Sequence, residues 1–311
     1  MNDTLEQDLI DDENRKKIIF IDDSAYLHRY YFGFPKKQSK FEGQTLEIGA
    51  LHGLLEFTDK IKKNFKEAEI IHVLDPDNGS QYRKSFHPTY KDRKDKEFEL
   101  VRQIQLLPSV LAGYGQSFIK VDGVESDDVL AKYAKIYGDD NLVMLMAEDK
   151  DVWQNIIDYR EDGKKGIVSA CRYSKGANGF NQFDMIFSDF ILEKFGIQPY
   201  QLADYLALNG DVSDNIPGVK GIGKVTAQKL LVNYGNINNI ILAAEEGDIK
   251  GKNREKILAG KEDLIFSKKL TLPFLDFDLP SIETLKPKDN LSVRFEAKKI
   301  VPPSLKWEYN I

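Results

Sequence analysis

Residues 17–22 read KIIFID, a run of four apolar side chains that ends directly in an aspartate. The same arrangement recurs at residues 70–75, where IIHVL is followed by Asp75. Short apolar runs that alternate with longer amphipathic stretches are typical of α/β proteins with a mostly parallel sheet. We therefore predict strands at 17–21, 70–74, 117–121 and 142–146, and helices near 45–66, 98–113 and 126–137.

Acidic side chains follow each of the four predicted strands. In chain order these are Asp22, then Asp75, then Glu125, Asp127 and Asp128, and finally Asp149 and Asp151. Because the carboxyl ends of parallel strands meet at one edge of a sheet, we expect these carboxylates to lie close together. A further pair, Asp211 and Asp214, follows a stretch of helical pattern in the sequence GDVSDN.

Carboxylates at such density repel one another, by about 4 kcal/mol for two charges about 4 Å apart at an effective dielectric constant of about 20. Few basic residues lie in these motifs, so bound cations are the simplest means of neutralising them. Oxygen ligands favour hard ions such as Mg²⁺ or Mn²⁺. Each acid alone is most simply explained as a cap or turn residue, but the whole set predicts a metal-dependent site for phosphoryl transfer.

The composition argues against several other classes of protein. The 311 residues include one cysteine, Cys171, and four histidines without the spacing of metal ligands, which disfavours a disulfide framework and a cysteine-based zinc site. No apolar run approaches the roughly 18 residues of a membrane span, and the N-terminus is acidic, unlike a secretory signal. We expect a cytoplasmic protein that is not secreted and does not bind a membrane.

Charge is distributed unevenly along the chain. Residues 1–15 hold six acids against Arg15 and account for most of the net charge of −6, so we predict a disordered acidic tail there. Residues 81–94 hold five basic side chains against Asp92. A local basic segment on a near-neutral body is compatible with a polyanionic partner, and equally with a solvated helix face.

In their order along the chain, these motifs resemble the 5′-nuclease or flap endonuclease family, in particular the 5′→3′ exonuclease domain of bacterial DNA polymerase I and its free-standing phage relatives. The resemblance covers about residues 17–275. It rests on Ile21-Asp22, Leu74-Asp75, GVESDD at 123–128, DKD at 149–151 and GDVSDNIPGV at 210–219.

The resemblance implies a PIN-like α/β fold, with a mostly parallel sheet flanked by helices, a helical arch and a helix–hairpin–helix subdomain that binds DNA. We expect a nuclease domain at 16–190 with the arch near 81–105, and the DNA-binding subdomain at 191–275. Residues 276–311 would form a C-terminal wrap.

The resemblance also implies two metal sites for Mg²⁺, with Mn²⁺ as a substitute. Their ligands would be Asp22, Asp75, Glu125, Asp127, Asp128, Asp149, Asp151, Asp211 and Asp214. The set from Glu125 to Asp151 would lie nearest the catalytic ion, and Asp211 and Asp214 nearer the second.

Basic residues gain roles from the same resemblance. Lys91 matches the arch lysine that contacts the scissile phosphate, where a cation stabilises the developing charge, and Tyr90 is expected to stack on a displaced base. The family arginine usually lies three residues after that lysine, a place held here by Lys94, with Arg93 one residue early. We expect Arg29, Arg83 and Lys84 to contact DNA.

The sequence GVKGIGKVTA at 218–227 looks like a helix–hairpin–helix element. Gly221 and Gly223 would let the backbone approach a phosphate, the next helix would offer its free N–H groups, and Lys220 and Lys224 would add charge. Such contacts do not read base sequence. The resemblance further implies a K⁺ ion held by carbonyls of this turn.

Two acids depart from the family pattern. Asp23 stands where the family commonly has Gly after the first aspartate, and Glu148 where it commonly has Gly before the aspartate of the fourth strand. Both would add negative charge next to the metals and alter metal preference, or else would simply point outward.

The resemblance therefore predicts a structure-specific 5′-nuclease, a 5′→3′ exonuclease and flap endonuclease with RNase H-like primer removal as a further activity. A two-metal mechanism would leave a 5′-phosphate and a 3′-hydroxyl during DNA replication or repair. Expected partners are branched or 5′-ended DNA, an RNA–DNA hybrid and a replication protein, and we expect a monomer. Two alternatives are a non-catalytic junction-binding DNA factor, which would lack metal ligands, and a PIN-type ribonuclease, which would lack the basic segment and the hairpin element.

Overall fold

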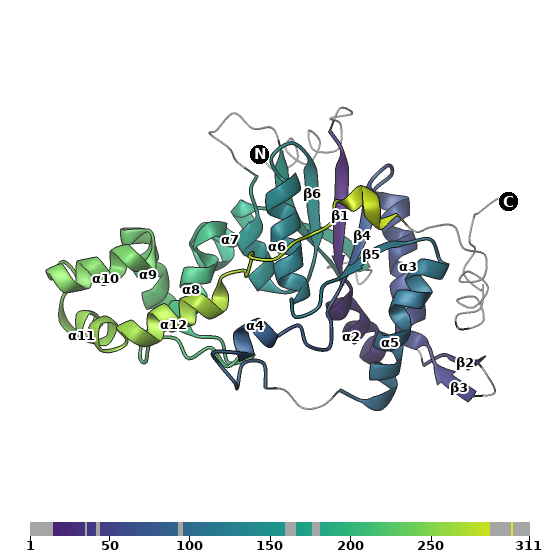
Figure 1. Ribbon diagram of the computed structural model, residues 1–311. Coiled ribbons are helices and arrows are strands. Elements are labelled where there is room, and N and C mark those ends of the chain that lie inside the picture. Colours follow the sequence, from purple (N-terminus) through teal and green to yellow (C-terminus); the bar gives the residue numbers. More distant parts are fainter. Residues whose placement is uncertain are drawn as a thin grey trace.

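The computed structural model describes residues 15–34, 36–41, 44–92, 96–158, 166–175, 181–286 and 300. Its centre is a six-stranded sheet of order β5-β4-β1-β6-β7-β8 (Figure 1). The strands are β1 (Lys17–Asp22), β4 (Glu69–Leu74), β5 (Ser117–Lys120), β6 (Leu142–Met146), β7 (Ile167–Lys175) and β8 (Asn181–Ile186). All neighbouring strands are parallel except β7 and β8, which confirms the prediction of a mostly parallel sheet.

Helices cover both faces of this sheet (Figure 1). One face packs against α2 (Asp23–Gly33), α3 (Gly49–Asn64) and α5 (Phe98–Gly113), and the other against α6 (Ser126–Tyr137). Ile19 and Ile21 of β1 belong to the first core, and Ile18 and Phe20 to the second, because successive strand side chains point to opposite faces. The unbroken apolar run in KIIFID therefore reflects a strand that is buried on both faces.

A helical lobe lies beside the sheet and continues one of its two cores (Figure 1). It contains α7 (Ser188–Phe195), η2 (Pro199–Gln201), α8 (Leu202–Asn209), α9 (Lys224–Tyr234), α10 (Ile237–Glu246), α11 (Gly251–Ala259) and α12 (Lys261–Thr271). The remaining elements are the hairpin of β2 (Gln38–Phe41) and β3 (Gln44–Glu47), α4 (Gln81–Lys84), η1 (Lys150–Asn155) and η3 (Ile282–Leu285).

Residues 160–182 are rich in Gly, Lys, Ser and Asn, a composition that suggests hairpins or loops. Within this range residues 167–175 form strand β7, which pairs antiparallel with the next strand, β8, and in which Cys171 is fully buried. The helix predicted near 45–66 begins only at Gly49, since strand β3 precedes it. Strand pairing overrides the local helical pattern there.

The arch segment is helical only at its two ends in the part that the structure describes. Helix α4 covers residues 81–84 and α5 begins at Phe98, while residues 85–92 are not helical. Arg93 and Lys94 lie outside the described residues, as does the acidic tail up to residue 14. None of the helices described is both long enough and apolar enough to traverse a lipid bilayer.

Candidate active site

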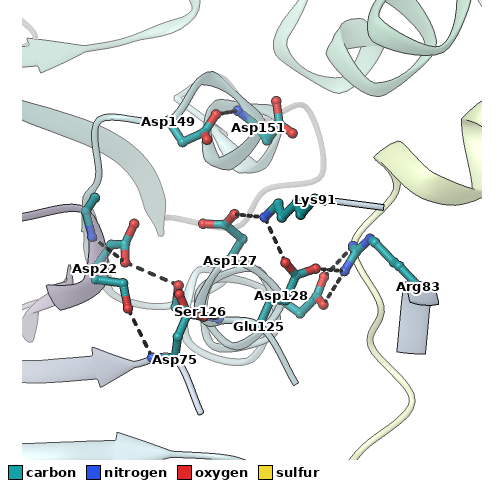
Figure 2. A network of polar contacts seen from close by, with 12 residues as sticks. Asp22, Asp75, Arg83, Lys91, Glu125, Ser126, Asp127, Asp128, Asp149 and Asp151 are labelled. Atoms are coloured by element: carbon teal, nitrogen blue, oxygen red, sulfur yellow. Dashed lines mark hydrogen bonds and ion pairs between the residues drawn. The ribbon is translucent and has the colours of Figure 1, made fainter. Parts of the chain in front are cut away.

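The carboxyl ends of β1, β4 and β6 meet the first turn of α6 at one place (Figure 2). Asp22 ends β1 and caps α2, Asp75 follows β4, and Asp149 follows β6 and caps η1. Asp127 and Asp128 lie in the first turn of α6, whose N-cap is Glu125, and the helix dipole stabilises negative charge there. The sheet and one helix thus bring together acids from four distant parts of the chain.

The carboxylates of Asp22, Asp127 and Asp151 are buried and repelled by neighbouring carboxylates. We call these three the crowded carboxylates. Burial and the charges of Asp75 and Asp149 raise the pKa of Asp22 to about 7. Burial and Asp149 likewise raise the pKa of Asp151 to about 7. Burial raises the pKa of Asp127, and the charges of Asp22, Asp149 and Asp75 add to that rise against an opposing effect of Lys91. Incompletely compensated negative charge is therefore concentrated at these three side chains.

Glu125 is held very differently, between two cations (Figure 2). Arg83 Nη1 donates a hydrogen bond to Glu125 Oε2 at 2.6 Å, and Lys91 Nζ donates one to Oε1 at 2.8 Å. Burial disfavours the charge of Glu125, but Lys91 and Arg83 outweigh it and lower the pKa of this carboxyl. Arg83 also makes two bonds to Asp128, of 2.7 Å and 2.8 Å. We call Arg83, Lys91, Glu125 and Asp128 the clamp.

Arg83 does not have the phosphate-holding position that the sequence suggested. Its guanidinium is buried, with 5% of the residue exposed. Besides its two carboxylate partners, it donates to the carbonyls of Leu270 and Leu272 at 2.9 Å and 3.0 Å. Helix α4 turns this side chain inward, toward the end of α12, while leaving the neighbouring Lys84 exposed.

Tyr90 also faces inward, contrary to the predicted stacking on a displaced base. Only 3% of the residue is exposed, and its ring packs with Ile216 and Leu270, so neither face is open to a base. Lys91 has the left-handed φ of 47°. Its ammonium contacts Glu125 and lies 3.9 Å from Asp127 Oδ2, at the border between the clamp and the crowded carboxylates.

Asp211 and Asp214 belong to the turn that follows α8. Lys150 Nζ donates to Asp211 Oδ2 at 2.6 Å and lies 3.8 Å from Asp151 Oδ1, so it links this turn to the crowded carboxylates. Although burial opposes the charge of Asp211, Lys150 and Ser213 lower the pKa of its carboxyl. Asp214 is buried, and its carbonyl accepts the Lys91 backbone N–H at 3.4 Å.

Two residues that sequence reasoning missed hold the site together. Ser126 donates its backbone N–H to Asp75 Oδ1 at 2.6 Å and its hydroxyl to Asp22 Oδ1 at 3.2 Å (Figure 2). Lys150 is the second such residue, since it links Asp211 to Asp151. The sequence features that could have predicted these two roles are slight: a serine at the first position of an acidic helix, and a lysine between two aspartates.

The donor set suits a hard divalent cation. Every candidate ligand is a carboxylate, and Asp151 Oδ1 is buried without a hydrogen-bond partner in the part of the chain that the structure describes. Within those same residues, no three acidic, histidine or cysteine side chains are arranged to bind one ion directly. Because Mg²⁺ keeps several waters and takes only one or two carboxylates directly, the crowded carboxylates fit an ion that is held partly through water.

The two acids that depart from the family pattern are each paired away from the crowded carboxylates. Asp23 is fully buried and contacts His72 Nδ1 at 2.7 Å. Glu148 forms an ion pair with Arg29, which also donates to the carbonyl of Tyr173. Arg29, which we expected to contact DNA, is therefore engaged within the protein.

The turn between α8 and α9 presents backbone and positive charge to solvent. Lys220, Gly221, Gly223 and Lys224 are all exposed. Gly221 has a φ of 83°, which glycine adopts without strain. Helix α9 begins with Gly223 as its N-cap and no side-chain cap, so its first N–H groups can donate to an outside anion.

A pocket of about 490 Å³ lies away from the acids, and its described lining includes Phe65, Met144, Phe183 and Met185 but no acidic residue. Cavity size therefore does not mark the candidate site, whereas the chemistry of the side chains does.

Two family models match the chain. The model for the 5′-3′ exonuclease N-terminal resolvase-like domain matches residues 17–174, and that for the 5′-3′ exonuclease C-terminal SAM fold matches residues 197–290. A 5′-3′ exonuclease of Buchnera aphidicola subsp. Schizaphis graminum is 34% identical over 229 residues, which are 73% of each protein. The DNA polymerase I of Caldicellulosiruptor bescii is 30% identical over 92% of this chain, which spans only 33% of that polymerase.

Solved structures support the fold. The 5′-exonuclease of bacteriophage T5 with zinc bound has a TM-score of 0.63 and 20% identity, covering 82% of this chain and 89% of that one. The T5 flap endonuclease in complex with DNA and metal ions has a TM-score of 0.62, also at 20% identity. At this level of identity the likeness concerns the arrangement of the sheet and the helical lobe.

Proposed function

Because the chain belongs to the 5′-3′ exonuclease family, we propose that it is a metal-dependent, structure-specific 5′-nuclease with 5′→3′ exonuclease and flap endonuclease activity. Its substrates would be branched or 5′-ended DNA and the RNA–DNA hybrids of primers, processed in replication or repair. The observation that carries the proposal is the concentration of crowded carboxylates beside Lys91 at the carboxyl edge of the sheet.

The proposed ion ligands are the crowded carboxylates together with neighbouring acids at the same edge. In full, these are Asp22, Asp75, Asp127, Asp149 and Asp151, with Asp211 and Asp214 toward a second ion. Bound Mg²⁺, or Mn²⁺ in its place, supplies Lewis-acid stabilisation of phosphoryl oxygens and activation of water. The resemblance also implies Glu125 and Asp128 as ligands; because their oxygens bind Arg83, we assign them instead to holding the shape of the site.

Lys91 is the proposed catalytic cation of the protein itself. Its ammonium lies between Glu125 and Asp127, where it would donate to a phosphate oxygen and stabilise charge that develops on the transferring phosphoryl group. Hydrolysis would break the bond between phosphorus and the 3′-oxygen of one strand, leaving a 3′-hydroxyl on the released 5′ fragment and a 5′-phosphate on the remainder of the same strand.

DNA would be held mainly through its backbone. Lys220 and Lys224, with the N–H groups around Gly221 and Gly223, form an exposed basic turn at the start of α9, and the exposed Lys84 lies on α4. Arg93 and Lys94 would contact the DNA backbone from the arch. Arg29 would do so once a phosphate replaces Glu148 as its partner. Contacts of this type predict binding that follows DNA shape and does not depend on base sequence.

The two family models divide the chain between residues 174 and 197, which supports the proposed boundary near residue 191 between a nuclease domain and a DNA-binding subdomain. A monomeric state, a cytoplasmic site of action and contact with a replication protein are proposed from the resemblance alone.

A 5′-labelled flap duplex tests the proposal, with a nicked duplex, single strand, RNA–DNA hybrid and hairpin RNA as companions. We expect Mg²⁺ to support release of the flap and EDTA to prevent it. Asp149→Asn should lower cleavage at least about a thousandfold while flap binding persists, and Asp122→Asn, in an exposed turn nearby, should leave it unchanged.

Other outcomes identify the alternatives. Unchanged turnover by Asp149→Asn would refute the metal-site assignment. Flap binding without cleavage in any divalent ion would identify a junction-binding factor, and cleavage of the hairpin RNA alone would identify a ribonuclease.

A further inference from the structure

The side chain of Lys256, on α11, lies across the turn between α8 and α9. Lys256 Nζ donates a hydrogen bond to the carbonyl oxygen of Gly221 at 2.8 Å. A Cβ atom at Gly221 would lie 2.9 Å from Lys256 Cε and 3.1 Å from its Nζ. Glycine is therefore favoured at position 221 for its left-handed backbone, and the absence of a Cβ lets the end of this lysine lie against the turn.

Below that contact, the turn and the helix that carries the lysine are packed together. Ile222 of the turn and Ile257 of α11 are 3% and 0% exposed, in the same apolar core. Gly260, at the end of α11, approaches Val219 so closely that a Cβ would lie 3.0 Å from Val219 Cγ1. The backbone that carries Lys256 is thus fixed relative to the turn, which positions the Lys256 ammonium at the Gly221 carbonyl.

This contact bears on the potassium ion expected at the turn. A K⁺ ion bound to the Gly221 carbonyl would lie beside the Lys256 ammonium, and two positive charges at such short separation repel. The Gly221 carbonyl therefore already has a cationic partner, the Lys256 ammonium, which belongs to the chain itself. As built, the turn does not fit a K⁺ ion at Gly221.

We propose that the Lys256 ammonium is the cation of this turn, that it holds the Gly221 carbonyl in place, and that it makes DNA binding by this protein independent of K⁺. Lys256 is a positioning residue, because it acts on DNA through the backbone of Gly221. The inference rests on the proposed function, since it assumes that the turn binds DNA phosphates.

The test measures the dissociation constant of the full chain for a fluorescent 5′-flap duplex by anisotropy, with EDTA present to prevent cleavage. Three salts are compared at equal ionic strength, KCl, NaCl and tetramethylammonium chloride, because affinity for DNA depends on total salt. We expect the wild-type dissociation constant to agree within about twofold across the three.

Lys256→Met removes the tethered cation. In tetramethylammonium chloride we expect it to bind the flap about tenfold more weakly than wild type, the size expected for loss of a charge-assisted hydrogen bond. KCl should restore part of this loss, because K⁺ can then reach the vacated carbonyl. Lys256→Arg should behave as wild type in every salt.

Lys252→Met is the matched control, since Lys252 is an exposed lysine one turn earlier on the same helix. It should change affinity by the same small factor in all three salts. If Lys256→Met does not fold, Lys256→Gln serves in the same comparison.

Two results would overturn the inference: wild-type affinity that rises in K⁺ over tetramethylammonium, or a Lys256→Met loss of equal size in all salts, which would make Lys256 a direct phosphate contact. A wild-type protein that binds no flap duplex in any salt would instead refute the proposed function.

Discussion

Glu125 and Asp127 lie two residues apart at the start of α6, yet the protein treats their charges in opposite ways. Glu125 is enclosed by Arg83 and Lys91, which lower its pKa. Asp127 is 3.9 Å from Lys91 but faces other carboxylates, and its pKa is raised by burial and by those charges. A single acidic motif thus supplies one group that maintains the shape of the site and one that favours a cation.

Removing Arg83 should have the largest effect on stability. Arg83→Met leaves Glu125 and Asp128 buried with less compensation and should lower the free energy of unfolding by about 3–5 kcal/mol. Denaturant unfolding at pH 7 measures the loss. Lys84→Met, at the exposed next position, should change it by less than about 0.5 kcal/mol. Equal effects of the two changes would show that the clamp does not stabilise the fold.

Neutral isosteres at the two acids should act with opposite sign. In EDTA at pH 8, Glu125→Gln should lower the free energy of unfolding by about 2 kcal/mol, because two charge-assisted hydrogen bonds weaken. Asp127→Asn should raise it by about 1 kcal/mol, because it relieves repulsion. Thermal and denaturant unfolding of both variants provide the measurement. A change of the same sign in both would contradict the distinction between clamp and crowded carboxylates.

The metal-free protein should lose stability as pH rises through neutrality. Asp22 and Asp151 have pKa values of about 7 in the folded state, against an ordinary value of 3.8. The folded state therefore binds more protons than the unfolded state between these values, so stability present at low pH is lost up to about pH 7, by on the order of a few kcal/mol. Melting temperatures in EDTA from pH 5 to 8 measure this slope.

The lowered pKa of Glu125 acts in the opposite direction, since its contribution to stability is lost on acidification. Asp22→Asn should reduce the loss of stability that accompanies the rise toward neutral pH. Added Mg²⁺ should also reduce this loss of stability. A melting temperature that rises steadily from pH 5 to 8 in EDTA would contradict the crowding of these carboxylates.

The smallest expected effect concerns Glu148, which pairs with Arg29 at a partly exposed position. Glu148→Gly should alter the free energy of unfolding by no more than about 1 kcal/mol. It should strengthen flap binding about twofold to threefold, because Arg29 is released toward phosphate. Anisotropy at fixed salt tests this, with Glu148→Gln as a second variant. Weaker binding by both would show that Glu148 holds Arg29 in its binding position.

The sequence was sufficient for the four strands β1, β4, β5 and β6 and for the acids that follow them. Asp22, Asp75 and Asp149 directly follow, or nearly follow, buried apolar runs, and parallel strands must deliver such residues to one edge. The helix at 126–137 was equally legible from its apolar period and its acidic first turn.

The burial of individual polar side chains and their long-range partners could not be predicted from the sequence. Arg83 and Tyr90 look like surface residues in a basic segment, and only the approach of α12 from 187 residues away encloses the guanidinium. Lys150 and Lys256 appear as ordinary charged residues until the fold places one at Asp211 and the other at Gly221. Such partners depend on tertiary contacts, which local pattern does not encode.

The two carbonyls that Arg83 binds, those of Leu270 and Leu272, have a consequence for biosynthesis. A ribosome makes the acids of α6 and the arginine well before it reaches α12, so a nascent chain that ends short of residue 272 leaves part of this guanidinium without its acceptors. The catalytic edge of the sheet is therefore completed late in translation, when α12 has docked.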